Sequence, residues 1–330
     1  MAQRYAIVTG GAGFIGSHVV DALLADDWRV LVIDDLSAGD AGRVAGEATL
    51  EVVDITDRRA LDSVLDAARP AAIFHLAAQA SVTRSVADPG LDLEINVRGT
   101  LNVLEGATRH RAPVVFTSTG GALYGDRATL PTPENTPPAP ISPYGASKWA
   151  GEAYLTTWRE ASGIPHAVCR LGNVYGPRQT PHGEAGVVAI FSHQLWHGTA
   201  PTLFGFGKPT RDYVHVHDVA QALLAAVAHP GVFNVSTGVE TPVSGVFDRL
   251  RAAAHATLEA ELAPLRAGEL ERSCLDSSRA HEAFGWRAEI GVEEGLPATY
   301  RAFAEEFELD NAQAAGPPPA AARVGRARPR

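Results

Sequence analysis

The chain has 330 residues, of which 45% are hydrophobic and 20% are charged, proportions typical of folded globular domains and unlike those of disordered or fibrous chains. Its formal net charge of -10 argues against a general nucleic-acid or membrane surface, because its long-range field repels phosphate. No apolar run reaches the length of a membrane span and the N-terminal segment lacks the apolar stretch of a signal peptide, so we expect a cytoplasmic protein.

The first half of the chain alternates short apolar segments with longer amphipathic ones. Strands are predicted at residues 5–8, 30–33, 51–53, 72–75, 114–118 and 167–171. Helical periodicity with few breakers covers residues 17–25, 58–68, 97–109 and 147–161. Strands separated by helices predict an α/β fold, a doubly wound parallel sheet of the Rossmann type. Six prolines between residues 130 and 143 predict an ordered surface loop.

After residue 175 the alternation becomes irregular, which predicts a smaller, interleaved C-terminal substrate domain. A helix at 219–228 and a strand at 232–235 then return the chain to the sheet. We therefore divide the chain into a Rossmann domain (residues 1–174 plus 213–253) and a substrate domain (175–212 plus 254–310). Residues 311–330 are rich in alanine, proline and glycine, a composition that predicts a disordered tail.

A glycine-rich segment, residues 9–16, follows the first predicted strand and opens the first helix. Gly10, Gly13 and Gly16 permit a tight turn whose backbone N–H groups reach a pyrophosphate at the helix N-terminus. A glycine-rich turn can also be only a turn, but the second strand ends on Asp34, at the spacing where a carboxylate binds the adenosine ribose. Asp34 and Asp35 would repel a 2′-phosphate, which favours NAD over NADP.

Tyr144 and Lys148 are one helical turn apart, on one face of a helix that has just begun. An ammonium group near the phenol favours the phenolate, so we expect the pKa of Tyr144 to fall toward neutrality and Tyr144 to act as a general base. Alone, the spacing is more typical of a solvated surface pair; its place after a dinucleotide-binding segment favours the catalytic interpretation. Thr119, at the end of the preceding strand, could bridge Tyr144 and a substrate hydroxyl, whereas structural roles are expected for Thr117 and Ser118.

Metal chemistry is not expected. His215, His217 and Asp218 resemble a ligand set, but alternate histidines on a strand before a helix-capping aspartate are more often structural. Cys169 and Cys274 lie in apolar sequence without metal-ligand spacing, so they predict neither a metal site nor a disulfide framework.

Taken in order, several segments resemble the extended short-chain dehydrogenase/reductase family, NAD-dependent epimerases and dehydratases. The resemblance covers about residues 5–305 and rests on 9–16, 54–55, 75–78, 96–97, 117–119, Tyr144 with Lys148, and 170–177. Within that family the second half is most similar to the UDP-glucose 4-epimerases, through residues 181–188, 210–213 and 266–269.

The resemblance implies NAD as cofactor and a UDP-sugar as substrate. The residues that it places against NAD are Gly10, Gly13, Phe14, Ile15, Gly16, Asp34, Asp35, Ser37, Gly39, Asp54, Ile55, Leu76, Ala77, Ala78, Gln79, Asn96, Thr117, Tyr144 and Lys148. Those that it places against the sugar nucleotide are Thr119, Tyr144, Asn173, Gly186, Val187, Phe204, Arg211, Arg266, Glu269 and Ser273. Arg211 and Arg266 would supply the local positive charge that an acidic protein needs to bind a diphosphate. Glu269 stands where the family more often has Asp.

The reaction implied by the resemblance is 4-epimerisation of a UDP-hexose through a transient 4-keto sugar, with Thr119, Tyr144 and Lys148 as catalytic residues. Dehydratases and decarboxylases of the family remain alternatives, but they carry acidic residues beside the strand-end threonine, where this chain has Gly120 and Gly121. A non-catalytic NAD-binding sensor can share the fold, although such proteins commonly lack the tyrosine or the lysine. The resemblance also implies a homodimer through the helices at residues 97–109 and 147–161.

The sugar is less defined. The residue that gates the sugar pocket, often tyrosine in the family, is Ser273 here, so substrates larger than glucose, such as UDP-glucuronate or N-acetyl sugars, are a hypothesis. Thr180 stands where some glucuronate epimerases have arginine, which removes one carboxylate partner. Thr117, Ser118 and Thr119 could still bind a carboxylate.

Overall fold

The central sheet of the computed structural model, which describes residues 4–126, 128–182, 186–266 and 269–314, has seven parallel strands. In sheet order they are β10 (Gly231–Val235), β6 (Ala167–Leu171), β5 (Val114–Thr119), β4 (Ala72–His75), β1 (Tyr5–Thr9), β2 (Arg29–Asp34) and β3 (Thr49–Val52). The predicted doubly wound α/β fold is therefore confirmed. The strand order reverses between β1 and β4, and this switch point is where sheets of this kind bind ligands.

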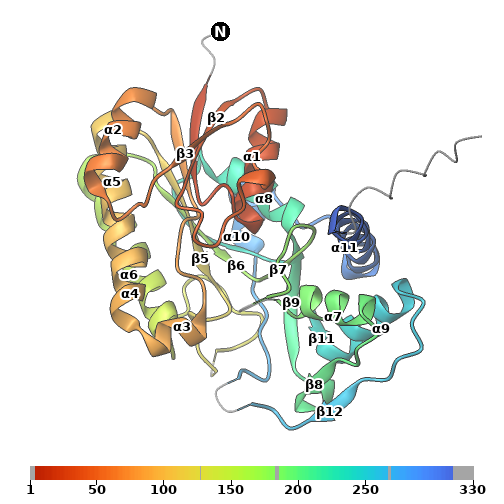
Figure 1. Cartoon of the computed structure of the whole chain (residues 1–330). Coiled ribbons are helices and arrows are strands. Elements are labelled where there is room, and N and C mark those ends of the chain that lie inside the picture. The colour runs from red at the N-terminus through yellow and green to blue at the C-terminus, as the bar shows by residue number, and fades with distance from the viewer. Residues whose placement is uncertain (1–3, 127, 183–185, 267–268, 315–330) are drawn as a thin grey trace, which may run out of the picture.

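Helices cover both faces of the sheet (Figure 1). Helices α1 (Phe14–Ala25) and α8 (Val216–Ala226) pack on one face, and α2 (Arg58–Ala68), α5 (Thr100–His110) and α6 (Pro143–Ser162) on the other. Neighbouring residues of β1 point to opposite faces: Val8 packs in the core beneath α1, and Ile7 in the core beneath α5. Both faces are apolar because both are covered.

A smaller unit lies beside the carboxyl ends of the strands, at the lower right of Figure 1. Its strands are β7 (Asn173–Tyr175), β9 (Thr210–His215) and β11 (Glu240–Pro242) in one sheet, and β8 (Thr202–Phe204) with β12 (Glu261–Ala263) in another. Helices α7 (Val187–Trp196), α9 (Val243–Ala253) and α11 (Val292–Ala314) enclose a third core around Tyr175, Phe191 and Phe247. The remaining helical elements are α3 (Val82–Ala87), α4 (Pro89–Leu93), α10 (Ser278–Phe284), the 3-10 helices η1 (Ala41–Arg43) and η3 (Gly205–Gly207), and the π-helix η2 (Glu94–Gly99).

Several element boundaries differ from the prediction. Helix α6 begins at Pro143, four residues early, because the Ser142 side chain accepts a hydrogen bond from Gly145 N and proline suits the first helical position. The segment predicted as one helix at 97–109 divides between the π-helix η2 and α5. Helix α11 reaches Ala314, so the prediction of disorder is wrong for residues 311–314, since extending a helix is easier than nucleating one. Residues 315–330 lie outside the described ranges.

The described residues contain neither a candidate membrane span nor a candidate metal site. Among these residues no helix is long and apolar enough to cross a membrane, and no group of three or more His, Cys, Asp or Glu is arranged to hold a metal ion. His215 is the N-cap of α8, because its side chain accepts a hydrogen bond from His217 N. The helix therefore begins at Val216, and Asp218 lies in its first turn. The prediction that Asp218 is the cap is therefore wrong.

Candidate functional site

The glycine loop between β1 and α1 is packed as closely as its backbone allows. A Cβ at Gly16 would lie 2.0 Å from the Gly10 carbonyl oxygen, and a Cβ at Gly10, whose φ is +73°, would lie 2.6 Å from Ala77 N. Gly13 caps α1 and has no side chain to satisfy the helix N-terminus, so the N–H groups of the first turn, at Phe14 and Ile15, are available to an anion. This close cradle fits the pyrophosphate of a dinucleotide.

The carboxylate of Asp34 closes the other side of the loop. It accepts hydrogen bonds from Ala12 N (3.0 Å) and Leu36 N (2.9 Å), and Gly39 lies against it, since a Cβ there would approach Oδ1 to 2.8 Å. Burial raises the pKa of Asp34, and Asp35 adds to the shift. The carboxylate of Asp34 therefore lies next to the glycine loop, as predicted, and its hydrogen bonds also fix the conformation of the loop.

A buried histidine links the glycine loop to β4 and α5. The Thr9 hydroxyl lies 2.7 Å from His75 Nδ1, and the Thr100 hydroxyl lies 3.0 Å from His75 Nε2. Thr100 donates to the Asn96 carbonyl, so it accepts from Nε2–H, and His75 is neutral; burial lowers its pKa to about 3. Leu76 N donates to the Thr9 carbonyl, which fixes the predicted segment at residues 76–78 beside the loop.

Asn96 lies in the π-helix η2 and is almost fully buried. Its Oδ1 accepts from Gln79 N (2.8 Å), and its Nδ2 donates to the Gln79 carbonyl (2.9 Å), to Asp92 Oδ1 (3.1 Å) and to Ser147 Oγ (3.1 Å). The side chains of Gln79 and Asn96 thus hold the end of β4 against the first turn of α6. The predicted NAD contacts of these two residues remain predictions, since their amide groups are engaged within the protein.

Tyr144 and Lys148 lie on the first turns of α6, as predicted. Lys148 Nζ donates to the Thr117 carbonyl (3.0 Å) and lies 4.9 Å from the centre of the Phe116 ring. Tyr144 and Thr119 share a side-chain hydrogen bond. Tyr144 and Thr119 are partly exposed, whereas Thr117 and Lys148 are buried.

The predicted fall in the pKa of Tyr144 is wrong for the protein without its ligands. Burial raises the pKa of Tyr144 to about 12, Asp92 adds to the rise, and the hydrogen bond with Thr119 opposes it. Burial also lowers the pKa of Lys148 to about 8, against the charges of Asp92 and Glu152. Desolvation therefore exceeds the attraction that helical spacing suggests, and further positive charge beside Tyr144 is needed to stabilise its phenolate.

A buried network of hydrogen bonds and one ion pair, which the sequence did not predict, joins α6 to β5 and β6. Glu152 forms an ion pair with Arg170, with Nη2 2.6 Å from Oε2, and accepts from the Ser118 hydroxyl. Arg170 Nη1 also donates to Tyr124 Oη (2.7 Å), which donates to Asn234 Oδ1 (3.0 Å). The sequence marked Arg170, because this residue opens one of the segments on which the family resemblance rests. It did not indicate the partners of Arg170, which are distant in sequence.

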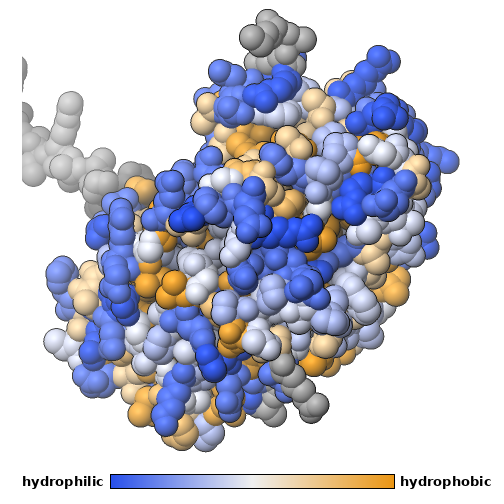
Figure 2. Space-filling view, turned by 180° about the vertical axis from the view of Figure 1, so that it is seen from behind, coloured by the Kyte–Doolittle hydropathy of each residue, from blue (hydrophilic) through white to orange (hydrophobic). Residues whose placement is uncertain are grey.

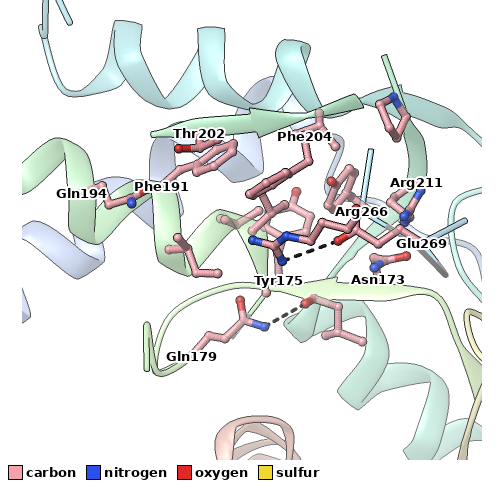
Figure 3. A pocket seen from close by; sticks show the side chains of 18 residues that line it. Asn173, Tyr175, Gln179, Phe191, Gln194, Thr202, Phe204, Arg211, Arg266 and Glu269 are labelled. Carbon is pink, nitrogen blue, oxygen red and sulfur yellow. Dashed lines mark hydrogen bonds and ion pairs between the residues drawn. The ribbon is translucent and has the colours of Figure 1, made fainter. Parts of the chain in front are cut away.

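Seven of the ten predicted sugar-nucleotide residues line one pocket of about 480 Å³ within the smaller unit. Figure 3 shows Asn173, Arg211 and Glu269 at one end of it, Phe191, Gln194 and Thr202 at the other, and the Arg266 guanidinium between them. The predicted residues that line it are Asn173, Gly186, Val187, Phe204, Arg211, Arg266 and Glu269. Residues that the prediction omitted include Tyr175, Gln179, Phe191, Gln194, Thr202 and Tyr213.

Arg266 is held across this pocket. Its guanidinium lies 3.7 Å from the centre of the Phe204 ring and 3.6 Å from Glu269 Oε1, and Arg211 Nη1 donates to the Thr210 carbonyl (2.8 Å). The departure at Glu269 is therefore accommodated by an ion pair with Arg266. Two arginines converging on one pocket provide the local positive charge that a diphosphate needs.

Ser273 lies in a second pocket of about 620 Å³, which shares Glu269 with the first and begins at Gly120 and Gly121, directly after Thr119. The segment that carries Ser273 is fixed by Asp212, a buried residue whose carboxylate accepts from Leu275 N (3.1 Å) and Gly238 N (3.0 Å). The chain between the two pockets is therefore tied to β9, next to Arg211.

Other predicted residues lie farther from these contacts. Asp54 Oδ1 accepts from Thr56 N, Ile55 packs against Gly99, and Asp35 accepts from the Ser37 hydroxyl and N–H. Thr180 is exposed, and its hydroxyl accepts from His182 N. Their contacts with a ligand remain predictions.

Comparison with known proteins gives concordant matches. Residues 6–236 match the NAD dependent epimerase/dehydratase family. The UDP-glucose 4-epimerase of Mycolicibacterium smegmatis is 44% identical over 305 residues, which span 90% of this chain and 97% of that protein. The structure of Thermotoga maritima UDP-glucose 4-epimerase with UDP-glucose superposes with a TM-score of 0.89 at 42% identity, covering 92% of this chain and 99% of that chain. The Thermus thermophilus UDP-glucose 4-epimerase in complex with NAD gives a TM-score of 0.85 at 42% identity, covering 91% and 98%.

Proposed function

The chain belongs to the NAD dependent epimerase/dehydratase family, and from that premise we propose that it is an NAD-dependent 4-epimerase of UDP-hexoses. The observation that carries this proposal is the gathering of seven predicted sugar-nucleotide residues in one pocket. That pocket shares Glu269 with a second pocket, which begins next to Thr119. A UDP group in the first pocket would place its sugar toward Thr119 and Tyr144.

In the proposed reaction the residues of the chain bind the sugar nucleotide, orient its C4 hydroxyl and transfer the proton of that hydroxyl. NAD, which the glycine loop and Asp34 would hold, would supply reversible hydride transfer at C4 of the sugar. Tyr144 accepts the proton of the C4 hydroxyl and gives it back, Thr119 orients that hydroxyl, and Lys148 supplies positive charge near the phenolate. Arg211 and Arg266 hold the diphosphate while the sugar turns.

The surroundings of Gly120 favour epimerisation over dehydration or decarboxylation. A Cβ at Gly120 would lie 2.4 Å from Leu275 Cδ1, so the acidic side chain that a dehydratase would need beside Thr119 would fit there only if Leu275 moved. At Gly121 the nearest atom to an added Cβ, Thr119 Oγ1, is 4.0 Å away, so an acid would fit there but is absent from the sequence.

The test of the proposed function is a substrate panel. The purified protein is incubated separately with UDP-glucose, UDP-glucuronate and UDP-N-acetylglucosamine, and the 4-epimers are resolved by NMR. We expect the 4-epimer of at least one of these sugars. The absence of an epimer in every sample would overturn the proposal, and a 4-keto-6-deoxy sugar would establish a dehydratase instead.

The Ser273 position should determine whether larger sugars are accepted. Ser273 lines the second pocket beside Gly120 and Gly121, so a tyrosine there would occupy space next to the sugar. We expect Ser273→Tyr to lower kcat/KM for UDP-N-acetylglucosamine about tenfold or more, with UDP-glucose little affected and Ser273→Ala as the size control. Unchanged turnover of the larger sugar by Ser273→Tyr would contradict this assignment.

We further propose a homodimer that packs α5 and α6 against their symmetry mates. Exposed apolar side chains on and around these helices, Val86, Leu93, Trp149 and Tyr154, support such an interface, whereas the face shown in Figure 2 is mostly hydrophilic with scattered hydrophobic residues. Light scattering should give twice the mass of one chain. Trp149→Glu, which buries a charge in the proposed interface, should give the mass of one chain, and a wild-type protein of that mass would refute the dimer.

A further inference from the structure

Lys148 is a buried cation that needs a countercharge. Its side chain is only 4% exposed, and the groups that touch it are the Thr117 carbonyl at 3.0 Å and the face of the Phe116 ring at 4.9 Å. Both attract a cation, but neither carries a charge. An ammonium group removed from water is costly unless a negative charge compensates it.

Most charged groups around Lys148 are already neutralised. Glu152, one turn farther along α6, also raises the pKa of Lys148, but its carboxylate is held by Arg170 through contacts of 2.6 and 3.1 Å and is therefore shared with another cation. His75 on β4 is neutral and donates into a network of threonine hydroxyls. Tyr144 retains its proton, since burial raises the pKa of its phenol.

Asp92 on α4 is different, because the partners of its carboxylate are neutral. It is 1% exposed, and its Oδ1 accepts from Gln79 Nε2 (2.9 Å) and Asn96 Nδ2 (3.1 Å). The negative charge of Asp92 nevertheless acts on the catalytic pair, raising the pKa of both Lys148 and Tyr144. Through Asn96, which also donates to Ser147 Oγ, the same carboxylate is joined to the first turn of α6.

We propose that Asp92 is the buried counterion of Lys148 and a positioning residue of the site, which keeps the ammonium charged and aligns the first turn of α6 through Asn96. Its catalytic meaning rests on the proposed function. The charge relation between Asp92 and Lys148 does not, and it is tested without turnover.

The sequence offers an unusually clean test, because Lys148 and Lys208 are its only lysines. Protein labelled with ¹³C at lysine Cε should therefore give two side-chain resonances, that of buried Lys148 and that of exposed Lys208, and Lys208→Arg assigns them. Removing the charge of Asp92 should lower the pH at which Lys148 titrates. We expect Asp92→Asn to shift the Lys148 midpoint downward by about one pH unit, with the Lys208 midpoint unchanged.

Glu94→Gln is the matched control, since it removes an equal charge two residues away at an exposed position. It should leave the Lys148 midpoint in place, because solvent screens the exposed carboxylate. If Asp92→Asn does not fold, Asp92→Ser is the second neutral variant, since its hydroxyl can still accept from one amide. A Lys148 midpoint that stays at the wild-type value in either folded neutral variant overturns the proposal.

The pH profile of kcat supplies a second readout that a packing role alone would not move. Because the charge of Asp92 raises the pKa of both Tyr144 and Lys148, Asp92→Asn should shift both limbs of the profile to lower pH, and Asp92→Glu should restore them. A lower maximum with unmoved limbs would overturn the charge role. If wild-type protein forms no epimer while the Lys148 midpoint still shifts, the proposed function fails and the counterion assignment stands.

Discussion

Replacing Tyr144 with phenylalanine should reduce turnover of a UDP-hexose by about 100- to 10,000-fold, the range that a positioned general acid or base contributes, while NAD still binds. The phenol hydroxyl is the group that exchanges a proton with the substrate in the proposed reaction, and phenylalanine removes it with little change of volume. The glycine loop and Asp34, which form the predicted cofactor site, lie on β1, β2 and α1 and are not touched by the change.

The measurement is kcat by NMR of the 4-epimer, together with calorimetric titration of NAD into wild type and variant. Tyr154→Phe, a second tyrosine on α6 that is exposed, is the matched control and should retain wild-type turnover. Normal turnover by Tyr144→Phe would refute the assigned role. Loss of NAD binding together with turnover would show that the tyrosine acts through the cofactor site.

The state of Tyr144 also predicts that catalysis depends on assembly of the site. Because the pKa of Tyr144 is about 12 in the protein without its ligands, the phenol is protonated at neutral pH. A phenolate forms readily only when positive charge is added nearby. Spacing in the sequence indicates that a lysine can reach the tyrosine, but it does not show how far both side chains are removed from water. For that reason the sequence predicted that Tyr144 and Lys148 lie together at the start of α6 but gave the wrong direction for the pKa of Tyr144.

The two ligand sites differ in how far the sequence could predict them. The glycine loop is contiguous, and its constraint is local: Gly10 and Gly16 are required by contacts within a few residues and with β4. The pocket of about 480 Å³ is assembled mainly from β7, β8, β9 and α7, together with Arg266 and Glu269. Its residues were found through family resemblance, and Gln194 or Thr202, which carry no motif, were not.

Asp92 and the pair of Glu152 with Arg170 show why the supporting residues were missed. Apart from Asn96, which lies four residues after Asp92, the partners named for these residues lie 13 to 46 residues away in sequence, so no local pattern predicts them. A buried charge becomes visible as a requirement only when the fold shows what surrounds it. The π-helix around Asn96 was missed for a similar reason, because its turn is set by contacts of Asn96 with Gln79 and Ser147 and not by periodicity.

Replacing Arg170 with methionine should lower the free energy of unfolding by about 3 to 5 kcal/mol, the typical effect of removing one partner from a buried ion pair. Arg170 and Glu152 are 5% and 3% exposed. Methionine fills much of the volume but leaves the Glu152 carboxylate without its cation and the Tyr124 hydroxyl without its donor. Urea denaturation of variant and wild type measures the difference, and a loss below about 1 kcal/mol, the value typical of exposed pairs, would contradict it.

Two further variants separate the cost of a stranded charge from loss of packing. The double variant Arg170→Met/Glu152→Leu removes both charges and should be more stable than Arg170→Met alone, since no ion is left uncompensated. Arg4→Met breaks an exposed ion pair with Asp26 and should have little effect. Glu152 also accepts a hydrogen bond from Ser118, which precedes Thr119, so Arg170→Met should lose turnover as well as stability. If Arg170→Met/Glu152→Leu recovers stability but not turnover, the role of the pair in stability is distinct from its role in positioning Thr119.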